Sequence, residues 1–465
     1  MKKEVVLLII VSILVKSCFF LLADHDLEEY TNGFFNTLGQ NFGEVLELCA
    51  FKEYGNHTYY GSKRVNFPVI ALELVSTLCN SIHSSGKFIP FIITNLIQIL
   101  QGLLIYSYLN LCYPILSALS ETVIEKKHYQ VSVIFLLGLF WINPISVYTC
   151  SLLSFGAEIE LLIQLLLLWI SVHSSNHYRA LLPIISAINV YYSPNISTSL
   201  IPASLSLFLL GNSHHRVPQV YPKHLGNFKA HFAQSWNQFC SEYLNFSKLS
   251  KIISFFISFL IIFFSLHALS FLLVHDQNFT LKDYIQAYFA QNFTLLEDKD
   301  LSPYLNIHWF LMSCINPEFR LFFQIILGSS LSVYASIIII SLENIPFKAL
   351  QSQMLICFVF KSNPTFTNYL LIFFFILFDS FTVFESKISI LASLSFVTWM
   401  TCIPLAFLIR PIWILDNLLE SNLYYFLTSI GHFSIFIFIG EWIKSLFDTL
   451  VKSNLHMYRI KQEYR

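Results

Sequence analysis

The sequence predicts an all-α polytopic membrane protein with about twelve transmembrane helices. Hydrophobic residues occupy 55% of the 465 positions, and charged residues occupy only 12%. Soluble domains carry about 25% charged residues, so this chain has too few polar side chains to cover a water-soluble globule. Apolar runs of helical length recur along the whole chain. The net charge of -1 gives no indication of a nucleic-acid partner.

The expected spans cover most of the chain, which we treat as a single transmembrane domain of residues 1–465. Some spans are short, and 130–143 would rise only ~21 Å against a hydrocarbon core of about 30 Å. A short span needs burial among neighbouring helices or a locally thinner bilayer. The expected ranges are 4–22, 88–110, 130–143, 157–173, 180–192, 198–211, 251–275, 319–341, 347–360, 367–384, 388–409 and 424–449.

Basic residues set the expected topology. They flank the first span on its N-terminal side, recur through the loop 212–250 and end the chain. The positive-inside bias therefore places both termini and the loop 212–250 in the cytosol, and the loops 23–66 and 276–318 in the lumen. The apolar run 67–82 would reverse the later loops if it crossed the membrane. We therefore interpret it as a re-entrant or interfacial segment on the lumenal side.

Both lumenal loops contain amphipathic segments. Residues 33–51 and 276–300 place apolar side chains at helical spacing, which is typical of a helix that lies in the membrane interface. The stretch 301–310, LSPYLNIHWF, then brings amphipathic rings suited to a membrane–water boundary. Glycosylation sequons begin at Asn56, Asn195, Asn245, Asn278 and Asn292. The topology leaves the sequon at 245 in the cytosol.

A series of short motifs resembles one known family. In chain order they are Lys16 in the first span, YYG at Tyr59–Gly61 before Pro68, Asn143-Pro144, DLSPYLNIHWF at Asp300–Phe310, FKSNPT at Phe360–Thr365 and SNLYYFLTS at Ser421–Ser429. Their order and spacing resemble the U subunit of the GPI transamidase, the phosphatidylinositol-glycan class U family. The sequence departs from the family pattern at Val65, at Asn368 and after Trp309-Phe310, where the expected glutamate is absent.

The resemblance implies a fold similar to that of the lipid-linked-sugar glycosyltransferases, without glycosyl transfer. It implies a membrane subunit of a five-protein complex in the endoplasmic reticulum, which attaches GPI anchors to proteins. The catalytic thiol of that complex lies in a caspase-like partner subunit, and the U subunit holds the lipid part of GPI. We therefore expect no catalytic residue, no metal and no cofactor in this chain. The expected partners are the other transamidase subunits, the GPI lipid and the membrane.

The expected lipid-binding residues converge on the lumenal leaflet in this topology. Lys16 and Lys361 bring positive charge, the rings at 308–310 form an aromatic surface, and Ser421 opens the last span with free backbone N–H groups. The complete set is Lys16, Asn306, His308, Trp309, Phe310, Lys361, Ser362, Asn363, Ser421 and Asn422.

Each of these residues also has a purely structural interpretation. Lys16 can extend its ammonium to the interface, and Lys361 can anchor the end of a span there. Trp309-Phe310 can serve as an interfacial anchor, and Ser421-Asn422 as a helix N-cap. Two glutamates, Glu158 and Glu160, begin a span where the helix dipole favours negative charge, so they need no ligand.

An alternative function rests on the acidic residues that follow the first span. Asp24 and Asp26 lie where a lipid-linked mannosyltransferase of this fold keeps its metal-binding and base carboxylates. The second hypothesis is therefore a dolichol-phosphate-mannose-dependent GPI mannosyltransferase. Glu28 and Glu29 follow closely, which favours a solvated acidic segment instead. A transporter or scramblase is a third hypothesis, and the sequence lacks the matched half-repeats that would favour it.

Overall fold

The computed structural model describes most of the apolar parts of the chain. These are residues 3–36, 88–119, 126–143, 155–173, 176–193, 197–210, 246–274, 280–285, 314–342, 346–361, 389–414 and 421–463, with a few single positions between them. All regular secondary structure within these ranges is helical, as the sequence predicts. The elements are α1 (Lys3–Asn36), α4 (Phe88–Leu119), α5 (Lys126–Ile142), α7 (Phe155–Val172), α8 (Asn176–Tyr192), η1 (Thr198–Leu200), α10 (Ile201–Leu210), α12 (Phe246–Val274), α15 (Pro317–Ser341), α16 (Pro346–Phe360), α18 (Ile390–Ile414) and α19 (Ser421–Glu463).

The helices fall on the expected apolar ranges. Within the described part of the chain, three are long and apolar enough to cross a membrane, namely Phe91–Tyr113, Leu249–Leu273 and Asn422–Ser445. Shorter apolar helices cover Tyr129–Ile142, Thr198–Leu209, Ser329–Ile340, Phe347–Phe360 and Ile390–Ala406. The total of about twelve spans therefore stays a prediction. The helix α1 continues to Asn36, so the start of the expected lumenal loop 23–66 is helical.

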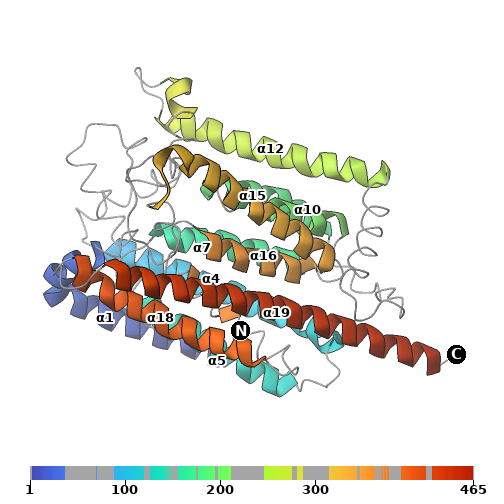
Figure 1. The fold of residues 1–465 in the computed structure, drawn as a ribbon, viewed down its shortest axis with the longest axis horizontal. Helices are drawn as coiled ribbons and strands as arrows, with labels where there is room; N and C mark the ends of the chain where they lie inside the picture. The colour runs from blue at the N-terminus through green and yellow to red at the C-terminus, as the bar shows by residue number, and fades with distance from the viewer. Residues whose placement is uncertain are drawn as a thin grey trace.

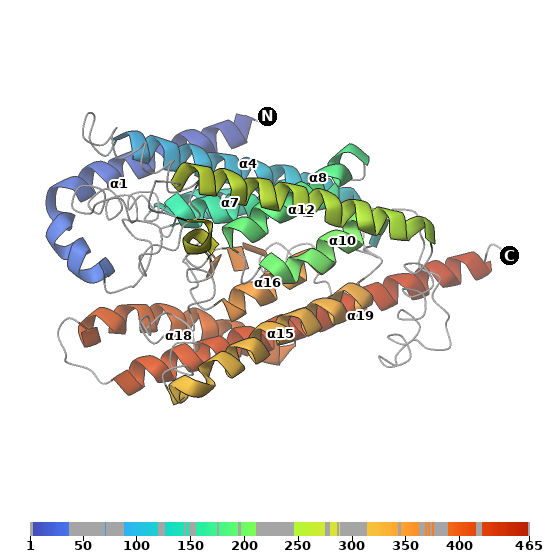
Figure 2. The same ribbon diagram turned by 90° about the horizontal axis from the view of Figure 1, so that it is seen from above.

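The helices run roughly along one common direction (Figure 1). At the centre lies α16, which packs against α7, α10, α15 and α19. Two helices, α18 and α19, form the most extensive helix pair, and α12 lies along one edge, where it packs against α8 and α10. The C-terminal part of α19 extends beyond the other helices (Figure 2).

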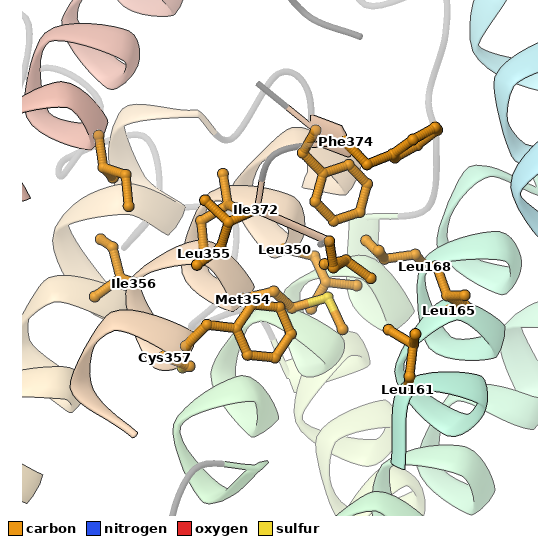
Figure 3. Packing of buried hydrophobic residues seen from close by; sticks show 14 of the residues in the cluster. Leu161, Leu165, Leu168, Leu350, Met354, Leu355, Ile356, Cys357, Ile372 and Phe374 are labelled. Carbon is orange, nitrogen blue, oxygen red and sulfur yellow. The ribbon is translucent and has the colours of Figure 1, made fainter. Parts of the chain in front are cut away.

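The interface between α7 and α16 forms the middle of the apolar core (Figure 3). Leu161, Leu165 and Leu168 repeat at helical spacing along α7, and they face Leu350 and Met354 of α16. All five side chains are buried. The outer helices are equally apolar but exposed, since only 11% of the most apolar window of α12 is buried. An exposed apolar helix face of this kind suits contact with lipid.

One glycine permits a close approach between two helices. A Cβ atom at Gly102 of α4 would lie 2.2 Å from the Trp141 ring of α5. The indole Nε1 of Trp141 donates to the backbone oxygen of Gln98, at 3.1 Å, and its side chain is fully buried. From α1, the hydroxyl of Ser12 donates to the backbone oxygen of Trp141. This contact fixes the positions of α1, α4 and α5 beside the polar residues described next.

Candidate functional site

Two buried glutamates at the start of α7 organise the polar interior. Glu158 is 1% exposed and Glu160 is 8% exposed. Residues two positions apart lie about 200° apart around a helix axis, so the two carboxylates point toward different neighbours. Glu158 faces α4, and Glu160 faces the end of α16. A carboxylate buried among apolar helices requires hydrogen-bonding or charged partners.

The Glu158 carboxylate accepts hydrogen bonds from two glutamines of α4. Gln98 Nε2 donates to Oε1 at 2.8 Å, and Gln101 Nε2 donates to Oε2 at 2.7 Å. The ammonium of Lys16, from α1, donates to Oε1 of Gln98. Lys16 is only 1% exposed, so its side chain lies inside the bundle and does not extend to the surface. We call these four residues the Glu158 network.

The Glu160 carboxylate forms an ion pair with Lys361, the residue that directly follows α16. The Lys361 ammonium lies 2.7 Å from both carboxylate oxygens, and the two side chains are only 10% and 11% exposed. Gln164 Nε2 adds a third hydrogen bond to Glu160 Oε1, at 3.1 Å. The pair joins positions 201 residues apart and holds the end of α16 against the start of α7.

A histidine of α19 caps the same end of α16. The last carbonyl groups of an α-helix have no partner within the helix. His432 Nε2 lies 2.8 Å from the backbone oxygen of Val359, in the last turn of α16. A carbonyl oxygen only accepts, so Nε2 carries the proton and the imidazole donates. His432 is 8% exposed, so this contact lies inside the protein, and Val359 is two residues before Lys361.

The structure places only part of the predicted site. Lys16 and Lys361 both contact the first turns of α7, the former through Gln98. The helix α19 begins at Ser421, as predicted, and its second residue, Asn422, is exposed. The other predicted positions, Asn306, His308, Trp309, Phe310, Ser362 and Asn363, lie outside the described residues.

The carboxylate partners are the part that sequence reasoning missed. Glu158 and Glu160 were expected to need only the helix dipole, yet both contact side chains from other helices. One sequence signal was available. Lys16 and Lys361 lie within or beside apolar runs, and a chain with so few charges has few acids to compensate them.

A second cluster joins α8 and α12 to the segment at 280–288. Its members are aromatic and polar. His267 Nδ1 lies 2.8 Å from the Tyr284 hydroxyl, and the Tyr191 hydroxyl lies 2.5 Å from Ser270 Oγ. The ring of Tyr288 packs edge-on against His267, with 4.4 Å between ring centroids. Burial raises the pKa of the Tyr288 hydroxyl above its usual range. This cluster attaches part of the predicted lumenal loop to the ends of two helices.

Local contacts explain why 281–285 is helical. Thr280 and Asp283 form a capping arrangement, in which the threonine hydroxyl donates to Asp283 Oδ2 at 2.6 Å and accepts from the Asp283 backbone N–H at 3.3 Å. The hydrogen bonds from Thr280 hold the pKa of the Asp283 carboxyl below its usual range. The Tyr191 hydroxyl also bonds to the backbone of Ile70. Ile70, the one described residue of the 67–82 segment, therefore lies beside this cluster.

Residues 7–430 match the family described as GPI transamidase subunit PIG-U. The chain belongs to the PIG-U family. This confirms the resemblance that the motifs predicted. PIG-U membership and the apolar helices identify a membrane protein of GPI-anchor biosynthesis in the endoplasmic reticulum. The matched range contains both glutamates and both lysines of the site, and His432 lies two residues beyond it. No curated protein matches the sequence.

Proposed function

We propose that this PIG-U chain is a non-catalytic subunit that holds the lipid part of GPI on the lumenal side of the membrane. The chemistry of anchor attachment lies in its partners, among them a caspase-like subunit with the catalytic thiol. One observation carries the proposal: two lysines and two glutamates are buried among apolar helices, where Lys361 pairs with Glu160 and Lys16 reaches Glu158 through Gln98. Ionisable residues inside a membrane domain are costly, so they mark functional sites.

The charged centre supports lipid binding by fixing the helix ends around it. Lys361 is bound to Glu160. Its main contribution is therefore to hold the end of α16, from which the chain continues to Ser362 and Asn363. The exposed Asn422 lies in the first turn of α19, where free N–H groups favour an anion. In this proposal Asn306 and the rings of His308, Trp309 and Phe310 complete an apolar surface with a polar rim, which complements a phosphoinositol lipid.

The decisive measurement is the amount of GPI that co-purifies with the complex, determined by mass spectrometry. We expect Asn422→Ala to lower it, and Lys361→Ala combined with Asn422→Ala to lower it further, at an unchanged ratio of subunits. A charged hydrogen bond contributes about 1.5–3 kcal/mol when desolvated, or roughly a tenfold or larger loss of affinity, and only about 0–1 kcal/mol where it stays in contact with water. Lys361→Ala is made together with Glu160→Gln, so that no buried charge is left alone. Wild-type levels of GPI in these variants would contradict the site.

The mannosyltransferase alternative depends on Asp24 and Asp26. Both positions lie in the helical continuation of α1 beyond the expected first span. We expect Asp24→Asn with Asp26→Asn to leave GPI mannosylation intact, because membership in a transamidase family favours a subunit without transferase activity. Precursor GPI species can be measured in cells that carry the double variant. Accumulation of an under-mannosylated precursor would contradict the subunit proposal and favour the mannosyltransferase.

The proposed topology has both termini in the cytosol, with 23–66 and 276–318 in the lumen. Basic residues at both ends of the chain and in 212–250 support it. We expect protease added outside sealed microsomes to cleave within 212–250 and to spare 276–305. The opposite pattern would mean that 67–82 crosses the membrane.

A further inference from the structure

The C-terminal part of α19 continues well past its candidate membrane span. The span ends at Ser445, whereas the helix continues to Glu463. Residues 446–463, which we call the α19 extension, add ~27 Å of helix at 1.5 Å per residue. Figure 2 shows that this part lies beyond the other helices. The match to the PIG-U family ends at residue 430, so the extension lies outside the matched part of the chain.

One face of the α19 extension is apolar. Phe447, Val451, Leu455 and Tyr458 follow one another at spacings of three or four residues, which places them on the same side of a helix. An apolar stripe of this period is typical of a helix that packs against another element. Residues 441–463 include neither glycine nor proline, so the extension contains none of the residues at which helices usually kink.

The bilayer can cover only the beginning of this face. The headgroup layer adds about 5–8 Å on each side of a hydrocarbon core of about 30 Å. Leu455 and Tyr458 lie ~15 and ~20 Å beyond Ser445 along the helix axis. The helices run roughly along one common direction, so a span at Asn422–Ser445 places both positions in the aqueous phase. An apolar face in water is stabilised by a protein partner that buries it.

The charges of the α19 extension distinguish between possible partners. The charged residues within 449–462 are all basic, namely Lys452, Arg459 and Lys461. At 100° per residue, the first two lie on one side of the apolar face and Lys461 lies on the other. A second copy of this chain would bring the same basic residues, and the loop 212–250 is also basic, so like charges would meet. An acidic helix would find opposite charge on both sides of the face.

We propose that the α19 extension binds an amphipathic helix with acidic flanks from a partner subunit. The apolar face from Phe447 to Tyr458 supplies the buried contact, and the basic residues on its two sides orient the partner. The inference requires only that the chain belongs to a complex, as its family does. It does not depend on where the GPI lipid binds, so it can fail without affecting the proposed function.

The test places the photo-cross-linking amino acid benzoylphenylalanine at single positions of the extension, in the intact complex in microsomes. Leu455 lies on the apolar face, and Ser453 lies on the opposite side of the helix as its matched control. We expect position 455 to give an adduct with one partner subunit, at a yield at least fivefold higher than position 453. Peptide mapping should place that adduct in a segment where acidic residues flank an apolar stripe.

The charge contribution is tested with Lys452→Glu combined with Arg459→Glu. We expect this double variant to lower the adduct yield at position 455 about fivefold, because acidic flanks would then meet acidic residues. The control is Thr449→Glu combined with Ser453→Glu, which adds two negative charges on the opposite side of the helix. We expect the wild-type yield in that control. Equal effects of the two double variants would contradict recognition of an acidic partner.

The identity of the adduct decides between the possible occupants of the face. A lipid adduct without a protein adduct at position 455 would mean that the membrane covers it. An adduct with the loop 212–250 of the same chain, or with a second copy, would mean that this protein covers its own face. Each of these results, or equal yields at positions 455 and 453, would overturn the inference. The amount of co-purified GPI tests the proposed function separately.

Discussion

The Lys361–Glu160 ion pair gives the sharpest test of the fold. Both carboxylate oxygens lie 2.7 Å from the ammonium, and the side chains are 10% and 11% exposed. Removing one partner of such a pair leaves an uncompensated buried charge, which costs about 3–5 kcal/mol. Replacing both partners by apolar side chains of similar volume is neutral or stabilising by about 1–4 kcal/mol. Each single variant should therefore lower the stability of the protein, whereas the double variant should leave it unchanged or raise it.

The variants are Lys361→Met, Glu160→Leu and their combination. Each is expressed with its partner subunits, and thermal stability is followed by fluorescence-detected size exclusion in detergent. We expect each single variant to lose stability strongly and the double variant to melt near the wild type. The difference between the double variant and the sum of the single variants gives the coupling energy of the pair.

An exposed ion pair serves as the control. Lys444 and Glu441 of α19 are 3.6 Å apart, and the lysine side chain is 66% exposed. Exposed pairs contribute about 0–1 kcal/mol, so Lys444→Met should leave the melting temperature almost unchanged. If Lys361→Met has an effect as small as Lys444→Met, or if the two single effects simply add, the buried pair does not hold α16 to α7.

Two further predictions concern packing and a helix cap. Gly102→Ala should destabilise the protein by at least the 1–3 kcal/mol typical of overpacking, since its Cβ would lie 2.2 Å from Trp141. Gly440→Ala, which meets nothing within 4 Å, should be neutral or slightly stabilising in the same melting assay. Thr280→Val should lower hydrogen-exchange protection of 281–285 several-fold, because the residue 280 side chain no longer donates to Asp283 Oδ2 or accepts from the Asp283 N–H. Because its pKa is lowered, the Asp283 carboxyl stays ionised at neutral and mildly acidic pH, where it keeps this cap. Protection of 281–285 should fall only as the pH drops through that pKa. Protection that is equal in wild type and variant would contradict the cap.

The helical ranges were predictable because apolar runs and helix breakers coincide with them. The helix α5 ends at Ile142, directly before Asn143-Pro144, and α15 begins at Pro317 after the N-cap Asn316. The extent of α1 was not predictable from membrane thickness. The thickness sets the length of the membrane-spanning part, but a helix can continue beyond it. No proline occurs before Pro68, so nothing in the covalent chain stops α1 at the end of the apolar run.

The site was predictable only in part because its contacts are long-range. A lysine beside an apolar run indicates that a partner is needed, but the sequence does not say which acid provides it. Lys361 and Glu160 are 201 residues apart, and Lys16 and Gln98 are 82 apart. The position of the glutamates at the start of α7 was also misleading, because the helix dipole already stabilises a glutamate in a first turn and no further partner seemed necessary. Only the packing of α7 between α4 and α16 selects the partners.

Because α7 lies between α4 and α16, polar contacts gather at its start and apolar contacts lie further along it. Lipid tails give helices little hydrophobic reason to associate, so packing and polar contacts must hold the ends together. Glu158 and Glu160, two residues apart, attach one helix start to two neighbours. Further along the same helix, Leu165 and Leu168 pack against α16 in a layer of apolar side chains (Figure 3). Polar contacts therefore hold the start of α7 to its neighbours, and apolar contacts hold its middle against α16.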